Sequence, residues 1–182
     1  NASISATGKG FRGAFGCANP DGGCGSFQDY FYPVSSGMGA EKGEGIAEVP
    51  VTMNGGRGPL ANGGGGGNKH NSGGGGGSNA MRGGRGGSEA SFCGSGPVGG
   101  EGGDTMDYTL GKIFMGGGGG SGHVNNDAAF PGGNGGGIVF IRSNNFVIRP
   151  GARILSNGAN VGGPKTGSSN DGYGGGGGGG SI

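Results

Sequence analysis

The sequence predicts a non-helical fold, a bundle or sandwich of polyglycine II helices that carries a small β-strand element. Three observations predict it. Glycine accounts for 59 of the 182 residues, and much of it is gathered in long runs. No window carries apolar residues at helical spacing together with a cap, so we expect almost no α-helix. β-Branched and aromatic residues are concentrated in residues 138–158, where we expect the β element.

The composition argues against several classes of protein. Only 8 residues are proline and glycine does not recur at every third position, so the chain is not collagen. No stretch approaches the roughly 20 consecutive apolar residues that span a bilayer, so we expect no membrane insertion. The net charge of +1 is too small to drive binding to nucleic acid, which we do not expect as a partner. A disordered low-complexity chain is the alternative to an ordered bundle.

The glycine runs are expected to form the body of the fold. Four runs are uninterrupted and two tracts contain one other residue: 63–67, 73–77, 116–120 and 174–180, with 83–87 and 132–137. The polar residues that bracket the runs predict turns between extended rods. Fixing a glycine costs roughly 0.5–1 kcal/mol more than fixing an alanine. We therefore expect glycine where a Cβ would collide with a neighbouring chain.

An extended threefold helix with a rise of about 3.1 Å per residue suits such packing. This helix has no internal hydrogen bonds, so its N–H and C=O groups must bond to adjacent segments, and lateral bundling satisfies them. Backbone hydrogen bonds then take the place of a side-chain core. The structural glycines that we expect at the centres of the runs are Gly65, Gly75, Gly118 and Gly177.

The β element is expected to contain strands at residues 138–142, 146–148 and 151–156 and to supply the sizeable apolar cluster of the chain. The glycine-run bundle then covers residues 62–137 and 162–180. Residues 1–182 form a single glycine-rich domain or a fragment of a longer repetitive chain. An internal echo favours the fragment, because residues 1–8 resemble residues 151–158, and residues 180–182 resemble residues 136–138.

We expect no enzyme, no metal site and no cofactor. Residues 8–13 match the G-x-G-x-x-G fingerprint but lack the helix that a dinucleotide site needs. No G-x-S-x-G elbow occurs, and nothing in the sequence pairs a nucleophile with a base. The histidines and loop aspartates lack zinc or calcium spacing; they are His70, His123, Asp104, Asp107 and Asp127. Arg82 and Arg85 resemble an RNA-binding RGG segment, but we interpret them as arginines at the rim of the bundle.

One aromatic cluster is the candidate for ligand contact. Residues 27–32 hold four of the chain's aromatic residues, namely Phe27, Tyr30, Phe31 and Tyr32. If exposed, these side chains offer a rigid contact surface for a sugar or a protein. If buried, they cap the bundle as a small core, and the sequence leaves both interpretations open.

Three cysteines allow at most one disulfide within the chain. Cys17 and Cys24 flank a turn-forming insert that could bring them together, which would suit an oxidising compartment. Three reduced thiols, with Cys93 as the third, are an equally good interpretation.

Three segments between residues 112 and 158 resemble sequences of a known class of proteins. Residues 112–126 (KIFMGGGGGSGHVNN), 132–142 (GGNGGGIVFIR) and 154–158 (ILSNG) resemble the glycine-rich repeat segments of large secreted and cell-surface proteins of gliding and related Bacteroidota. The predicted architecture is similar to the polyglycine-sandwich tip adhesins of phage tail fibres and to the glycine-rich ectodomain of anaplastic lymphoma kinase receptors. The resemblance implies export by a type 9 secretion route and a role in adhesion or gliding motility.

The leading functional hypothesis is a secreted or cell-surface structural and adhesive module, extracellular or on a bacterial cell surface. In it, a stiff polyglycine scaffold presents loops to a partner. The expected partners are other surface proteins, secretion-system proteins or surface glycans. The alternatives are a subunit of an extracellular filament, which requires self-association, and a folded cargo of a bacterial secretion system.

Overall fold

The computed structural model describes residues 2–16, 30–31, 33, 39–68, 70–88, 99–124, 130–161 and 171–182. Regular secondary structure in these ranges is short: the strands β1 (Ser3–Ser5) and β2 (Arg153–Leu155), and the 3₁₀ helices η2 (Val51–Met53) and η3 (Thr109–Gly111). None of the described ranges contains an α-helix. The prediction of a non-helical fold with a small β element is confirmed.

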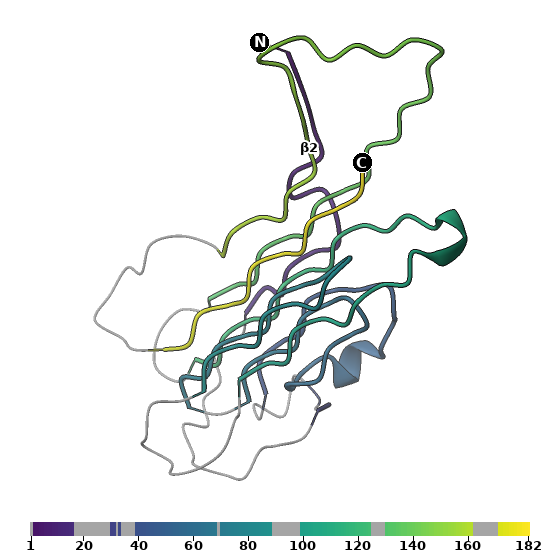
Figure 1. Cartoon of the computed structure of the whole chain (residues 1–182). Helices are drawn as coiled ribbons and strands as arrows, with labels where there is room; N and C mark the ends of the chain where they lie inside the picture. The colour runs from purple at the N-terminus through teal and green to yellow at the C-terminus, as the bar shows by residue number, and fades with distance from the viewer. Residues whose placement is uncertain are drawn as a thin grey trace.

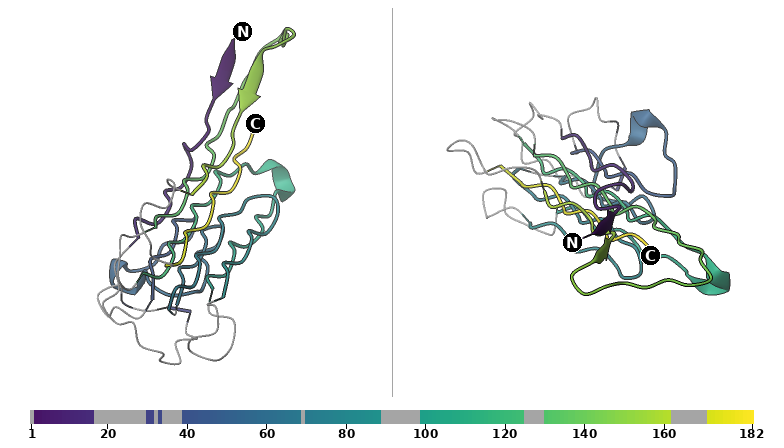
Figure 2. Two further views of the ribbon diagram at one scale, coloured as in Figure 1. Left: turned by 90° about the vertical axis from the view of Figure 1, so that its left-hand side faces the viewer. Right: turned by 90° about the horizontal axis from the view of Figure 1, so that it is seen from above.

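Extended segments that lie side by side make up the body of the molecule. Figure 1 shows them as gently winding stretches of chain along one common axis, with β1 and β2 projecting at one end. The segments keep this alignment in both further views of Figure 2. Backbone hydrogen bonds with N···O distances of 2.7–3.3 Å join neighbouring segments. The main chain itself therefore holds the bundle together.

The hydrogen bonds between two segments repeat every third residue. Gly64 N–H donates to Gly118 O at 2.9 Å, and Gly67 N–H, three residues on, donates to Ser121 O at 3.0 Å. In a β-ladder each strand would instead meet the same neighbour with every second residue. In this pair of segments the N–H donors therefore return to the same neighbour after three residues.

Successive N–H groups of one run point to different neighbours. Three consecutive donors in the run 63–67 reach three separate segments, with Gly118, Glu101 and Gly56 as the acceptors. The bonds measure 2.9, 2.8 and 3.0 Å in that order. Each run is thus fixed from several sides at once, and the bundle extends in two dimensions rather than as one flat sheet.

Most glycines of the runs have no room for a side chain. A Cβ would lie 1.9–2.1 Å from a backbone oxygen of another segment at Gly65, Gly75, Gly118 and Gly177. These are the glycines that the sequence predicts as structural. A carbon this close to an oxygen is far inside van der Waals contact, so any side chain there would push two segments apart.

Few side chains are buried among the described residues, and most of them are polar. The buried hydrophobic residues are Ala14, Ala40, Leu60 and Val124, whereas the largest fully buried side chains also include Asn62, Asn68, Ser72 and Ser121. Asn62, directly before a glycine run, donates to Met115 O at 2.9 Å and accepts from Ile46 N–H at 2.9 Å. Buried amides and hydroxyls therefore complete the backbone network where the runs end.

β1 and β2 form a two-stranded parallel sheet. Its register pairs Ser3 with Arg153, Ile4 with Ile154, and Ser5 with Leu155. Each partner stands 150 positions further along the chain, which is the offset of the internal echo between residues 1–8 and 151–158. The two similar sequences pair with each other in register.

Two of the three strands expected between residues 138 and 158 do not form. Residues 138–142 and 146–148 are not strands, and β2 pairs with β1 rather than within this segment. Val139 N–H still reaches Ser181 O, but residues 140–148 make no backbone hydrogen bond to any other described segment. They leave the bundle as the excursion at the top of Figure 1. A β-prone sequence without a neighbouring edge has nothing to pair with.

The apolar residues of segment 138–148 are found at the surface and not in the interior. Phe140 is 78% exposed and Val147 79% exposed, so the apolar side chains of this excursion face outward. The interior is already filled by glycine backbone, which leaves no second layer for these side chains to pack against. The apolar residues predicted to cluster in 138–158 therefore lie at the surface, where Phe146, Val147 and Ile148 border one hollow with β1 and β2.

We expect Gly118→Ala to destabilise the protein and Gly84→Ala to leave its stability nearly unchanged. A Cβ at residue 118 would lie 1.9 Å from Arg12 O, whereas a Cβ at residue 84 meets nothing within 4 Å. Overpacking of this kind costs roughly 1–3 kcal/mol or more. Scanning calorimetry of the two variants measures the difference. Equal melting temperatures would contradict the view that the runs are packed backbone against backbone.

Candidate functional site

The described part of the aromatic cluster is a pair of half-exposed rings. Tyr30 is 49% exposed and Phe31 is 44% exposed. Phe27 and Tyr32 lie outside the described residues. The two rings are therefore neither a buried cap nor fully solvated, and each keeps a surface that a partner can contact.

Lys42 lies against the Phe31 ring and is the largest fully buried side chain of the described residues. Its Nζ donates to three main-chain carbonyls: Gly56 O at 2.7 Å, Gly58 O at 2.6 Å, and Tyr30 O. The same ammonium lies 4.5 Å from the centroid of the Phe31 ring, within range of a cation–π interaction. Lys42 thus ties the aromatic segment to residues 56–58.

The surroundings of Lys42 change its acid–base behaviour. Burial lowers the pKa of Lys42 to about 7, because an ammonium group loses hydration when it leaves water. The three carbonyls act in the opposite sense, since an ammonium has three N–H donors to satisfy them. The residue is therefore poised between its charged and neutral forms near neutral pH.

Arg57 supports the second ring. Its guanidinium carbon lies 5.4 Å from the centroid of the Tyr30 ring, and its NH2 group forms an ion pair with Glu101. Arg57 and Glu101 are both largely buried, with 7% and 17% of their side chains exposed. A paired, partly buried arginine holds its position more firmly than an exposed one, so each ring is backed by a cation.

The two arginines of the RGG-like segment lie beside the same carboxylate. Arg85 approaches Glu101 at 3.4 Å, and Arg82 lies 3.9 Å from Glu101 and 3.8 Å from Asp104. Both are substantially exposed. This geometry agrees with the interpretation of Arg82 and Arg85 as residues at the rim of the bundle.

The arrangement suits contact with a partner by stacking. Exposed faces of Tyr30 and Phe31, backed by Lys42 and Arg57, offer flat surfaces for stacking against a sugar ring or an apolar side chain. The sequence identified the two rings but missed both cations. Nothing in the local sequence distinguishes Lys42 from an ordinary surface lysine, because its burial depends on segments that are distant along the chain.

The remaining candidate residues do not gather into a site in the described part of the structure. No group of three or more His, Cys, Asp or Glu residues there could hold a metal ion. Asp107 accepts from Thr109 N–H, and this hydrogen bond lowers the pKa of the carboxylate. Cys17, Cys24, Cys93 and Asp127 lie outside the described residues. Within the described ranges, none of the helices has the length and apolar character that a bilayer crossing requires.

Comparison of the chain with protein-family models, with curated proteins and with solved structures finds no match. Any function proposed for the chain therefore draws on its own residues and geometry.

Replacement of Lys42 by methionine is expected to remove a pH dependence of stability. The folded pKa of about 7 lies below the ordinary 10.5, so between these values the unfolded chain binds more protons than the folded one. The contribution of Lys42 to the free energy of unfolding therefore rises with pH in this window, by on the order of 1 kcal/mol per pH unit at most.

Chemical denaturation of the native protein and of Lys42→Met at several pH values measures this effect. The stability of the native protein relative to the variant should increase from about pH 7 towards pH 10. A difference that stays constant across this range would show that Lys42 keeps an ordinary pKa in the folded protein.

Proposed function

We propose that the glycine runs are polyglycine II helices packed into a sandwich. Three features support this assignment. The hydrogen bonds between segments repeat every third residue, as at Gly64 and Gly67. Most bonds of the runs lead to another segment, as the open threefold helix requires. Most run glycines also lack room for a Cβ, as expected where such helices lie in contact.

We further propose that the chain is a secreted or cell-surface structural and adhesive module, with the sandwich as its stiff scaffold. The observation that carries this proposal is the backbone network, in which each run is hydrogen-bonded to several neighbours. Such a network needs almost no buried side chains, so surface residues can serve a partner without weakening the core. A linker would gain nothing from so much ordered glycine.

The adhesive part of the proposal draws on the aromatic pair. Tyr30 and Phe31 present half-exposed rings that are held in place by Lys42 and Arg57. Rings fixed in this way lose little conformational entropy when a partner stacks on them. Surface glycans are the partner class that these rings suit best, with other surface or secretion-system proteins as the wider set. The proposed location is extracellular or on a bacterial cell surface.

A glycan array tests this function. The native protein should bind at least one class of surface oligosaccharide, and the double variant Tyr30→Ser with Phe31→Ser should bind it roughly tenfold or more weakly because it lacks both stacking faces. Phe146→Ser, which removes an exposed ring elsewhere, serves as the matched control. Equal binding by native protein and double variant, or recovery of the protein only from inside the producing cells, would contradict the proposal.

A second function, self-association into an extracellular filament, is favoured by an exposed apolar patch at the β1–β2 end. Ile4, Phe146, Val147 and Ile148 are each about half exposed or more. Together with β1 and β2 they border a shallow hollow of about 170 Å³. Exposed apolar groups gathered in one place are typical of contact surfaces. In this alternative, copies of the chain join through this end.

Sedimentation at increasing protein concentration tests the filament alternative. If copies associate through the patch, Val147→Asp should abolish the larger species, because a carboxylate would be buried in an apolar contact. Leu110→Asp is the control, since Leu110 is 94% exposed in η3, away from the patch. A native protein that remains monomeric at high concentration would eliminate this alternative.

A further inference from the structure

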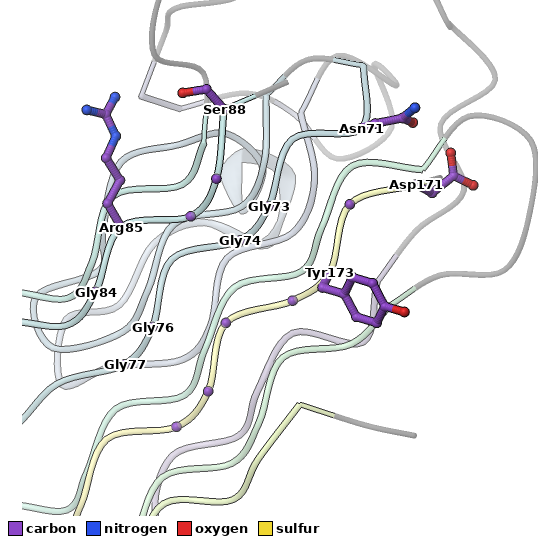
Figure 3. A pocket seen from close by; sticks show the side chains of 17 residues that line it. Asn71, Gly73, Gly74, Gly76, Gly77, Gly84, Arg85, Ser88, Asp171 and Tyr173 are labelled. Carbon is purple, nitrogen blue, oxygen red and sulfur yellow. The ribbon is translucent and has the colours of Figure 1, made fainter. Parts of the chain in front are cut away.

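A long groove runs along one side of the glycine bundle. It has a volume of about 780 Å³ and is lined mainly by the glycines of three segments, 73–77, 84–87 and 172–177. Figure 3 shows these segments with the side chains of Arg85, Ser88 and Tyr173 at the margins of the groove. The floor and walls of the groove are therefore almost bare backbone.

The floor of the groove is the run 73–77. The N–H groups of Gly73, Gly74 and Gly75 donate to three different segments, at 2.8–2.9 Å. Its carbonyls at residues 73 and 76 accept from a fourth segment, residues 100–103, and the carbonyl of residue 75 accepts from a fifth, at Gly120. This run is thus hydrogen-bonded to five neighbouring segments.

In one direction around this run, no segment of the described residues forms a hydrogen bond with it. The carbonyl oxygens of Gly74 and Gly77, three residues apart, accept no hydrogen bond from any described residue, and both glycines line the groove. Gly74 is buried, and a buried carbonyl is nearly always paired. Two unpaired carbonyls at the spacing of the bundle's own hydrogen bonds mark a position where a sixth segment would fit.

The walls of the groove supply N–H donors, which complement the two carbonyl acceptors on its floor. Gly84 and Gly87 on one wall and Gly176 on the other use their carbonyls to accept from the floor run. Their own N–H groups donate to no described residue. An extended chain in the groove could donate to the floor and accept from both walls. The groove therefore offers the hydrogen bonds that any run in the bundle receives.

The steric pattern of the floor run agrees with this interpretation. A Cβ at Gly75 or Gly77 would lie 2.1 or 2.0 Å from a backbone oxygen of the same molecule. A Cβ at Gly76 would have its nearest neighbours, Gly176 O and Gly84 N, at an ordinary 3.5 Å, between the two walls. The packing of this chain therefore does not demand glycine at residue 76. A second chain lying in the groove would require glycine at this position, because it would occupy the space of the Cβ.

We propose that the groove binds an extended glycine-rich segment of another polypeptide chain. Glycine is required because backbone packing in this bundle leaves no space for Cβ atoms on the enclosed sides. One residue in three can carry a side chain on the open side, as Arg82, Arg85 and Ser88 do in the exposed tract of this molecule. The expected ligand is thus a Gly-Gly-X repeat. This inference rests on the proposed polyglycine packing and names the partner of the scaffold.

A blocked synthetic peptide, (Gly-Gly-Asn)₃, tests the groove against the native protein, with binding followed by amide chemical shifts. The amides of Gly84, Gly87 and Gly176 should shift on binding. Gly76→Ala should weaken binding by roughly tenfold or more, because its methyl group would stand on the floor of the groove. Gly179→Ala is the matched control: its Cβ also has room, at 3.8 Å from Ser156 O, and it does not line the groove.

Two further ligands complete the test. The peptide (Ala-Ala-Asn)₃ has the same length and charge but carries Cβ atoms on the enclosed sides, so it should not bind. Binding of both peptides alike, no binding of the glycine peptide, or equal binding by Gly76→Ala would each overturn the proposal. A neutral oligosaccharide that shifts the same amides while the glycine peptide does not would also overturn it and make the groove a glycan site.

Failure of this proposal is distinguishable from failure of the scaffold proposal. If Gly118→Ala destabilises the protein but the glycine peptide does not bind, the packed scaffold stands and the groove assignment falls. If Gly118→Ala is harmless, the scaffold itself is wrong, whatever the peptide does.

Discussion

The structure depends on one steric constraint, the direct contact of backbone with backbone that only glycine permits. At Gly65 or Gly118 a single methyl group would lie 1.9 Å from a carbonyl oxygen of another segment. That closeness lets N–H groups of one run reach carbonyls of several others, so hydrogen bonds do the work that apolar packing does in most domains. The chain compensates for the high conformational entropy of glycine by pairing its backbone from several sides.

Buried side chains extend the backbone hydrogen-bond network at the ends of the glycine runs. Asn62 and Ser121 are fully buried and bond to main-chain groups beside the runs. Lys42 has the same role with a longer side chain, since its ammonium group donates to three carbonyls at once, and two of these, Tyr30 O and Gly56 O, also accept a backbone N–H. Such a group is costly to bury, which is why its pKa falls, yet it joins the aromatic segment to the bundle.

Because the interior is built from glycine backbone, the stability of the scaffold depends little on the side chains at the surface. Few side chains are needed inside, and Tyr30, Phe31 and Val147 remain exposed at the surface, as the proposed contact with partners requires. The groove beside Gly74 and Gly77 is a different kind of surface, where the carbonyls of both glycines accept no hydrogen bond from the described residues. In the proposed module, recognition by side chains and recognition by bare backbone therefore occur on one scaffold.

The local sequence was sufficient to predict a fold without α-helix, because glycine runs without apolar residues at α-helical spacing form neither an amphipathic α-helix nor a side-chain core. It also located the rings of Tyr30 and Phe31. It could not predict which segments pair. Residues 140–148 have strand propensity but find no edge, whereas Ser3–Ser5 and Arg153–Leu155 pair across 150 positions. Pairing, the burial of Lys42 and the groove arise between segments distant in sequence, so only the tertiary structure decided them.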